Sequence, residues 1–252
     1  MLYNPGDFID LHIHTRYSDG ELSVKSVLAR AEEYKLDVIS ITDHNTLLPH
    51  FELQSFNPKE FFSGKIINGV EINLVYEDYL LEGLAYNYDL VKLANNKYLN
   101  PNYRQKLETE IAQKLIEKAK KLNLKIDVSF LNKRILSGPI AFYYELRKHV
   151  DNNEFLTKHK IYTGRTFYRK HFTNTKGIFH LENIKVYFPT FKEMKQAVND
   201  AGGVLVLAHP VGTYQLPNER AIVKKMVKEK LLDGIECIHF NMPLKDTKFL
   251  IK

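Results

Sequence analysis

Two short polar stretches near the start of the chain have the residue types of a metal site. His12 and His14 follow the apolar run 8–11, and His44 follows the apolar run 38–41. Residues two apart on a strand point to the same face, so His12 and His14 can direct two imidazoles at one ion. Imidazole nitrogen binds several transition metals. The pattern predicts a transition-metal site, with zinc, manganese and iron left open.

Three further candidate ligands occupy comparable places in the chain. Asp19 lies in a Ser-Asp-Gly turn, Glu71 lies in a third apolar run, and His209 ends the run 204–208. A lone His-x-His pair is most simply a chance pair, but chance does not place all of these residues near strand ends. In sheets built from strand–helix units, ligands gather at the carboxyl ends of the strands. Glu71 is the natural bridge between ions that together promote phosphoryl transfer.

Other polar residues near these positions have weaker cases. Asp10 and Asp43 precede candidate ligands, and we expect them to orient those ligands as hydrogen-bond acceptors rather than to bind metal. His239 follows the last apolar run and is equally well explained as an ordinary residue at the edge of the sheet. A basic cluster either faces a phosphate or forms a solvated surface; its members are Arg165, Arg169, Lys170 and His171.

Composition limits the protein class. The 252 residues are 44% hydrophobic and 26% charged, an ordinary globular balance. No apolar run is long enough to span a bilayer, and the first residues lack a secretory pattern. The single cysteine, Cys237, favours a reducing cytoplasm. The net charge of +6 is compatible with a phosphate-bearing or nucleic-acid ligand, and equally with a generally lysine-rich proteome.

The order of predicted elements indicates an α/β fold. A helix capped by Ser23 joins the strands at 8–11 and 38–42, which implies a parallel pair. Strands at 65–72 and 79–86 follow, and the alternation resumes with a capping box at Thr190 and Glu193.

A long interruption divides this pattern. We expect residues 1–90 and 189–252 to form one discontinuous domain, and 91–188 to form a mostly helical insertion that covers the site. The insertion has a strong helix start at Asn100, a cap followed by proline.

The ordered motifs resemble those of PHP-domain metal-dependent phosphoesterases. The resemblance rests on Asp10-Leu-His-Ile-His-Thr15, Ile41-Thr-Asp-His-Asn-Thr46, Gly69-Val-Glu-Ile72 and Gly202-Gly-Val-Leu-Val-Leu-Ala-His-Pro210. The greatest similarity is to the branch of nucleoside 3′,5′-bisphosphate phosphatases and 5′–3′ exoribonucleases. It implies a distorted seven-stranded β/α barrel with up to three divalent ions. His12, His14 and Glu71 would hold the first ion, Glu71 and His209 the second, and Asp19 and His44 the third.

The chain departs from the family pattern in three places. The family has a histidine ligand on the strand after the glutamate, and alignment on Gly83 places Leu80 there. The family's final Asp-x-His motif has no counterpart before Lys252, which predicts either a fragment, the alternative we favour, or a degenerate member with an incomplete site. The insertion's arginine–histidine substrate element corresponds to Arg165 and Phe167, so Arg165 is a candidate substrate-binding residue.

These observations predict a hydrolase that cleaves a phosphate ester with metal-activated water. The expected substrate is a nucleotide or a short RNA end. One alternative is a histidinol-phosphatase-like activity on a small phosphate ester. The other is a non-catalytic module that binds phosphate. The oligomeric state is left open.

Overall fold

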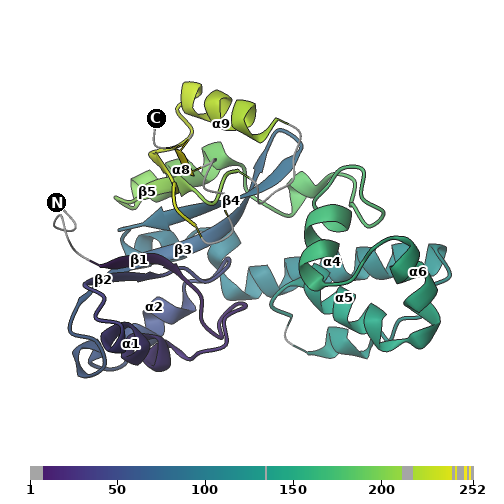
Figure 1. Cartoon of the computed structure of the whole chain (residues 1–252), viewed down its shortest axis with the longest axis horizontal. Helices are drawn as coiled ribbons and strands as arrows, with labels where there is room; N and C mark the ends of the chain where they lie inside the picture. The colour runs from purple at the N-terminus through teal and green to yellow at the C-terminus, as the bar shows by residue number, and fades with distance from the viewer. Residues whose placement is uncertain are drawn as a thin grey trace.

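The computed structural model describes residues 8–133, 135–211, 218–239, 242, 247, 248 and 250. Six strands in these residues form one sheet, in the spatial order of their numbering. They are β1 (Ile9–Ile13), β2 (Val38–Ile41), β3 (Lys65–Tyr76), β4 (Tyr79–Tyr86), β5 (Val204–Leu207) and β6 (Gly234–Ile235). In Figure 1 the sheet lies between one helical layer of α1 (Val24–Glu33) and α2 (Leu48–Leu53) and another of α8 (Phe191–Asp200) and α9 (Glu219–Lys228).

The strand directions bring several carboxyl ends to one edge of the sheet. Strands β1, β2 and β3 are parallel, and β4 is antiparallel to β3. Strand β5 is antiparallel to β4 and parallel to β6. The strands β1, β2, β5 and β6 therefore all end on the same side. The expected α/β class and the parallel pair at the start of the chain are confirmed.

The sheet curls into a half-barrel. Strands β1 and β6 are its two outer strands, yet His12 Nδ1 on β1 lies 2.9 Å from the Oε1 atom of Glu236, directly after β6. A flat sheet could not bring its outer strands together in this way. The curvature follows the α/β barrel geometry that the resemblance implied. The resemblance gave seven strands, and the described residues contain six.

The local signals for helix starts are confirmed. The side chain of Thr190 accepts a hydrogen bond from the Glu193 backbone N–H, and the Glu193 carboxylate accepts one from the Thr190 backbone N–H, so α8 begins with a complete capping box. Asn100 caps the 21-residue helix α4 (Pro101–Lys121). No helix in the described ranges is long and apolar enough to cross a membrane.

The predicted insertion, residues 91–188, is a set of mostly short helices with an aromatic core, and most of it is drawn on the right of Figure 1. Besides α4 it contains α5 (Gly138–Lys148), α6 (Asn153–Lys158), α7 (Gly164–Thr166) and a π-helix (Phe167–Phe172), and the short helix α3 (Leu90–Ala94) spans its first boundary. Short 3₁₀ turns occur within this range at Lys97–Leu99, Ser129–Asn132, Val150–Asn152 and Ile184–Val186, and one occurs before it at Pro58–Glu60. Phe142, Phe167 and Phe179 pack in one buried cluster with Ile111 of α4. Leu93 of α3 packs instead on the main core. The division at 91 and 188 remains a proposal.

One face of the β3–β4 hairpin connects the main sheet to the insertion. Three facing pairs follow one another along it, namely Glu71 with Leu84, Asn73 with Glu82, and Val75 with Leu80. Val75 and Leu80 both pack in the buried cluster of the insertion. The expectation that Leu80 stands at a ligand position is wrong, because Leu80 packs among these apolar side chains and does not line the cavity that contains Glu71 and Glu82.

Leu80→Ala should destabilise the protein. The substitution removes buried apolar contact between the hairpin and the insertion and leaves a cavity, which costs about 2–5 kcal/mol at core positions. Urea unfolding followed by circular dichroism measures the change. Leu122→Ala is the matched control, because Leu122 is 38% exposed and should change stability little. Equal effects for the two variants would contradict the anchoring role of Leu80.

Candidate metal centre

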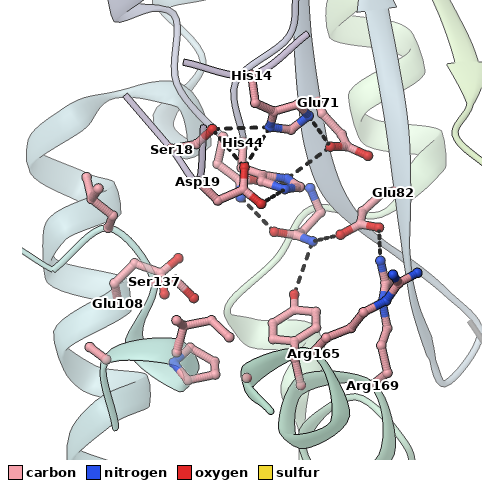
Figure 2. Close-up of a pocket in the computed structure, with 18 of the residues that line it drawn as sticks. His14, Ser18, Asp19, His44, Glu71, Glu82, Glu108, Ser137, Arg165 and Arg169 are labelled. Atoms are coloured by element: carbon pink, nitrogen blue, oxygen red, sulfur yellow. Dashed lines mark hydrogen bonds and ion pairs between the residues drawn. The ribbon is translucent and has the colours of Figure 1, made fainter. Parts of the chain in front are cut away.

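The buried carboxylate of Glu71 lies at the middle of the site. Its Oε2 atom is 3.2 Å from His12 Nε2, 3.2 Å from His14 Nε2 and 3.1 Å from His44 Nδ1. Its Oε1 atom is 2.9 Å from His209 Nε2. The side chain of Glu71 is 1% exposed, so four imidazoles replace water around it. Figure 2 shows His14 and His44 directed at this carboxylate. Five of the six predicted ligands therefore meet at one point.

Asp19, the sixth predicted ligand, lies at the open side of the same cluster. Its Oδ1 atom is 2.9 Å from His14 Nδ1, and its Oδ2 atom is 3.6 Å from His44 Nε2. The Asp19 side chain is 70% exposed, unlike that of Glu71. A ligand or an ion can therefore approach the cluster from this side.

Asp43 fixes the loop that carries Asp19. Its two carboxylate oxygens accept hydrogen bonds from the Thr15 backbone N–H (2.8 Å), the Thr15 hydroxyl (2.7 Å) and the Ser18 hydroxyl (2.6 Å). Asp43 thus orients the site through the loop rather than through an imidazole. Asp10 also contacts backbone, since it accepts the N–H of His12 at 3.1 Å.

Glu236 holds two of the histidines and was not predicted from the sequence. Its Oε1 atom is 2.9 Å from His12 Nδ1, and its Oε2 atom accepts the backbone N–H of His209 at 2.6 Å. His209 has a φ of +24°, a strained conformation that this hydrogen bond helps to hold. A carboxylate on Nδ1 leaves Nε2 of His12 for a metal ion. The sequence predicted a last strand over 234–239 with Glu236 inside it, whereas β6 ends at Ile235 and leaves Glu236 at the carboxyl end of the strand.

Glu82 is a second carboxylate that was missed. It is 3% exposed, and its Oε2 atom lies 3.6 Å from His209 Nε2. It stands on the same face of β4 as Leu80, two residues further along and therefore one pair closer to Glu71. Glu82, not Leu80, is the β4 residue that reaches the site.

His239 also reaches the site. Its ring centre is 5.4 Å from that of His12 and 4.9 Å from that of His209. The sequence left its role open between ligand and ordinary edge residue. Its place beside two predicted ligands adds another imidazole to the cluster.

The donor set fits divalent transition metals. Four overlapping groups of three residues have potential ligand atoms within 4.8 Å of one another. The groups are His12 with His14 and Glu71; His14 with Asp19 and His44; His44 with Glu71 and Glu82; and His12 with His209 and His239. Mixed imidazole and carboxylate ligands suit zinc, and three protein ligands with an open position are typical of catalytic sites.

The carboxylates strongly favour positive charge on the imidazoles. Burial alone would lower the pKa of His12, but hydrogen bonds to Glu236 and Glu71 raise it to about 10. Burial likewise opposes the charge on His14, yet its contacts with Asp19 and Glu71 raise its pKa to about 9. The pKa of Glu71 falls well below its usual range despite burial, chiefly because of His44. The carboxylates and imidazoles of the cluster thus stabilise each other's charged forms.

Metal affinity should therefore increase with pH. An imidazole binds metal in its neutral form, so an ion must displace the proton that the raised pKa values hold on His12 and His14 at pH 7. We expect zinc to bind more tightly at pH 8.5 than at pH 6.5 and to release protons. Isothermal titration calorimetry in two buffers of different ionisation enthalpy measures both quantities. Equal affinity at the two pH values, with no proton release, would contradict this account.

A cavity of about 1040 Å³ opens from the cluster toward the insertion. Its wall on the insertion side contains Ile140, Tyr144, Phe188, Arg165 and Arg169. The two arginines belong to the predicted basic cluster, so at least this part of the cluster faces the site. Figure 2 shows Arg165 and Arg169 together near Glu82 in this cavity. The cavity thus joins a candidate metal centre to a partly apolar wall with two guanidinium groups.

Comparison with known proteins identifies the family. Residues 10–162 match the family model described as PHP domain, which is more than half of the chain. The chain belongs to the PHP-domain family. The predicted membership of the PHP-domain family is confirmed, and this family supports a metal-dependent hydrolase in general.

Two curated relatives share a name but cover different shares of the chain. The 5′-3′ exoribonuclease Rnm of Escherichia coli is 23% identical over 82% of this chain and 66% of its own length. The protein of the same name from Salmonella typhimurium is 29% identical over 44% of this chain and 38% of its own. The chain thus spans less than two thirds of the length of either relative.

Solved structures share the fold at low identity. A candidate metal-dependent phosphoesterase from Bifidobacterium adolescentis has a TM-score of 0.68 and 21% identity, over 98% of this chain and 82% of that one. An amidohydrolase from Chromobacterium violaceum, solved with bound sulfate and no metal, has a TM-score of 0.70 and 19% identity. That match covers 96% of this chain and 80% of the other.

Proposed function

We propose that this protein hydrolyses a phosphate ester on a nucleotide or a short RNA end with the help of divalent metal ions. The observation that carries the proposal is the buried Glu71 carboxylate, which meets four imidazoles at the end of a cavity with two arginines in its wall. The exoribonuclease name of both curated relatives supports a nucleotide substrate.

The residues divide into a metal-holding set and a substrate-holding set. His12, His14 and Glu71 would hold the first ion, and the other groups of the cluster would hold further ions. Bound divalent ions lower the pKa of water toward neutrality and stabilise the charge that develops on the phosphoryl oxygens. Because Glu71 faces imidazoles with both of its oxygens, it is suited to bridge two ions.

The insertion side of the cavity suits the remainder of the substrate. Arg165 and Arg169 can bind phosphate oxygens through paired N–H donors. The side chains of Ile140, Tyr144 and Phe188 offer apolar and aromatic surface to a base or a sugar. A protein that hydrolyses a very small phosphate ester has less need of a cavity of about 1040 Å³, which favours a nucleotide over the small-ester alternative.

Glu71→Gln should lower the hydrolysis rate by about 10³-fold or more, because the charge that holds the ions and the imidazoles is lost. The purified chain, loaded with manganese or zinc, is assayed on a nucleoside 3′,5′-bisphosphate, on a 5′-phosphorylated RNA oligonucleotide and on histidinol phosphate. Glu117→Gln is the control, since the Glu117 side chain is 58% exposed on α4 and should leave the rate unchanged.

The products separate the possible activities. Release of inorganic phosphate from the bisphosphate indicates a phosphatase, and release of mononucleotides from the oligonucleotide indicates an exonuclease. Turnover of histidinol phosphate alone would replace the nucleotide substrate with a small ester. Phosphate binding without turnover of any substrate would contradict the proposal and favour the non-catalytic alternative.

A further inference from the structure

The Glu82 carboxylate is paired with an arginine of the insertion. Arg169 Nη2 donates to Glu82 Oε2 at 2.8 Å, and the side chains are 13% and 4% exposed. Figure 2 shows the guanidinium reaching this carboxylate across the cavity. Burial would raise the pKa of Glu82, but the neighbouring positive charge of Arg169 lowers it instead. Glu82 is therefore a carboxylate that already has a cation.

The surrounding structure holds Arg169 in this position. Arg169 lies in the π-helix Phe167–Phe172, whose wider turn differs from that of an α-helix. The preceding residue, Tyr168, accepts a hydrogen bond from Asn73 Nδ2 at 3.2 Å. The same amide group donates to Glu82 Oε1 at 3.3 Å. Two consecutive residues of the π-helix are thus tied to the facing pair Asn73 and Glu82.

Asn73 also connects this arrangement to the metal centre. Its side-chain oxygen accepts from Asn45 Nδ2 at 2.6 Å, and its backbone N–H donates to Asn45 Oδ1 at 2.9 Å. Asn45 directly follows the candidate ligand His44 and has a φ of +54°. The pairing of Arg169 with Glu82 is therefore part of a network that extends to the metal ligands.

The same carboxylate is a candidate metal ligand. One oxygen of Glu82 lies within 4.8 Å of the ligand atoms of His44 and Glu71. An ion held by these three residues would place a second positive charge beside the Arg169 guanidinium. Two cations about 4 Å apart repel each other strongly where water is largely excluded. Glu82 can satisfy the ion or the guanidinium, but occupancy by one opposes the other.

We propose that Arg169 and a divalent metal ion compete for Glu82, so that this part of the centre holds either the guanidinium or an ion. The inference rests on the metal centre of the proposed function. It gives Arg169 a role beyond phosphate binding, because its pairing with Glu82 sets how many ions the centre holds. The position formed by His12, His14 and Glu71 does not include Glu82 and should fill without this competition.

Arg169→Gln should make the site at Glu82 bind its ion more tightly, by about tenfold or more, which lies within the usual range of coupling between two ligands. Manganese is titrated into the wild-type protein and the variant. Electron paramagnetic resonance counts free Mn²⁺, and calorimetry gives the affinities. Arg147→Gln is the matched control, because it also removes a guanidinium from the insertion. The Arg147 guanidinium donates to the Tyr143 hydroxyl and to the Tyr162 carbonyl, not to Glu82. This variant should match the wild type.

Two further variants keep the test decisive. Arg169→Met retains the aliphatic stem, so it carries the same expectation if Arg169→Gln does not fold, which circular dichroism reports. In the double variant Arg169→Gln with Glu82→Gln, the gain in affinity should disappear, since the gained ion needs the Glu82 carboxylate. A gain that survives in the double variant would overturn the competition for Glu82.

The outcomes separate this inference from the proposed function. Ions bound by the wild type, with unchanged number and affinity in both Arg169 variants, would overturn the competition and leave the metal centre intact. Absence of bound ions in every protein tested would overturn the metal centre and the competition together.

Discussion

The contact between one buried carboxylate and four imidazoles is the constraint on which the site depends. Glu71 is almost fully buried, and a carboxylate without water or a positive partner would be costly there. His12, His14, His44 and His209 supply those partners from β1 and from the segments after β1, β2 and β5. The curl of the sheet and the strained backbone of His209 help to bring these rings to one carboxylate, and the loop held by Asp43 brings Asp19 to the open side of the cluster. The charge at the centre thus couples strands that are distant in the sequence.

Much of this arrangement could be predicted because it depends on strand direction alone. Parallel strands end on the same side, so His14, His44 and His209 could be placed together without knowledge of any contact. The caps at Asn100 and Thr190 were equally accessible, because a cap depends on residues only two or three positions away. Predictions of this kind rest on local chemistry and on chain topology.

The features that were not predicted from the sequence depend on contacts between distant segments of the chain. Glu82 was missed because its position depends on the pairing of β3 with β4. The alignment on Gly83 gave Leu80, which lies on the correct face of β4 but one pair too far from Glu71. The π-helix at Phe167–Phe172 had no periodic signal, because its shape is set by contacts with the hairpin and the aromatic core. No local pattern encodes such contacts.

The β3–β4 hairpin explains how the insertion is attached. Along one face, the side chains change from the metal-site carboxylate of Glu71, through the polar pair Asn73 and Glu82, to the apolar pair Val75 and Leu80. The apolar contacts of Val75 and Leu80 hold the insertion against the hairpin, but such contacts are not directional. The hydrogen bonds of Asn73 and Glu82 are directional and fix the orientation of the insertion. The Glu77–Asp78 turn adds surface ion pairs to Lys225 and Lys185 on either side. The cavity therefore has a wall that is built on the same hairpin as the metal centre.

The two buried carboxylates of this hairpin both have positively charged partners. Its buried carboxylates need positive charge, and the structure supplies protons on His12 and His14 for Glu71 and a guanidinium from Arg169 for Glu82. Protons are available to any folded chain at neutral pH, whereas Arg169 is present only when the insertion packs against β4. Folding of the insertion is thereby linked to the charge balance of the site. A divalent ion bound at this centre would take the place of these positive charges, so its binding would reflect the difference between two satisfied states and not the full attraction of the carboxylates.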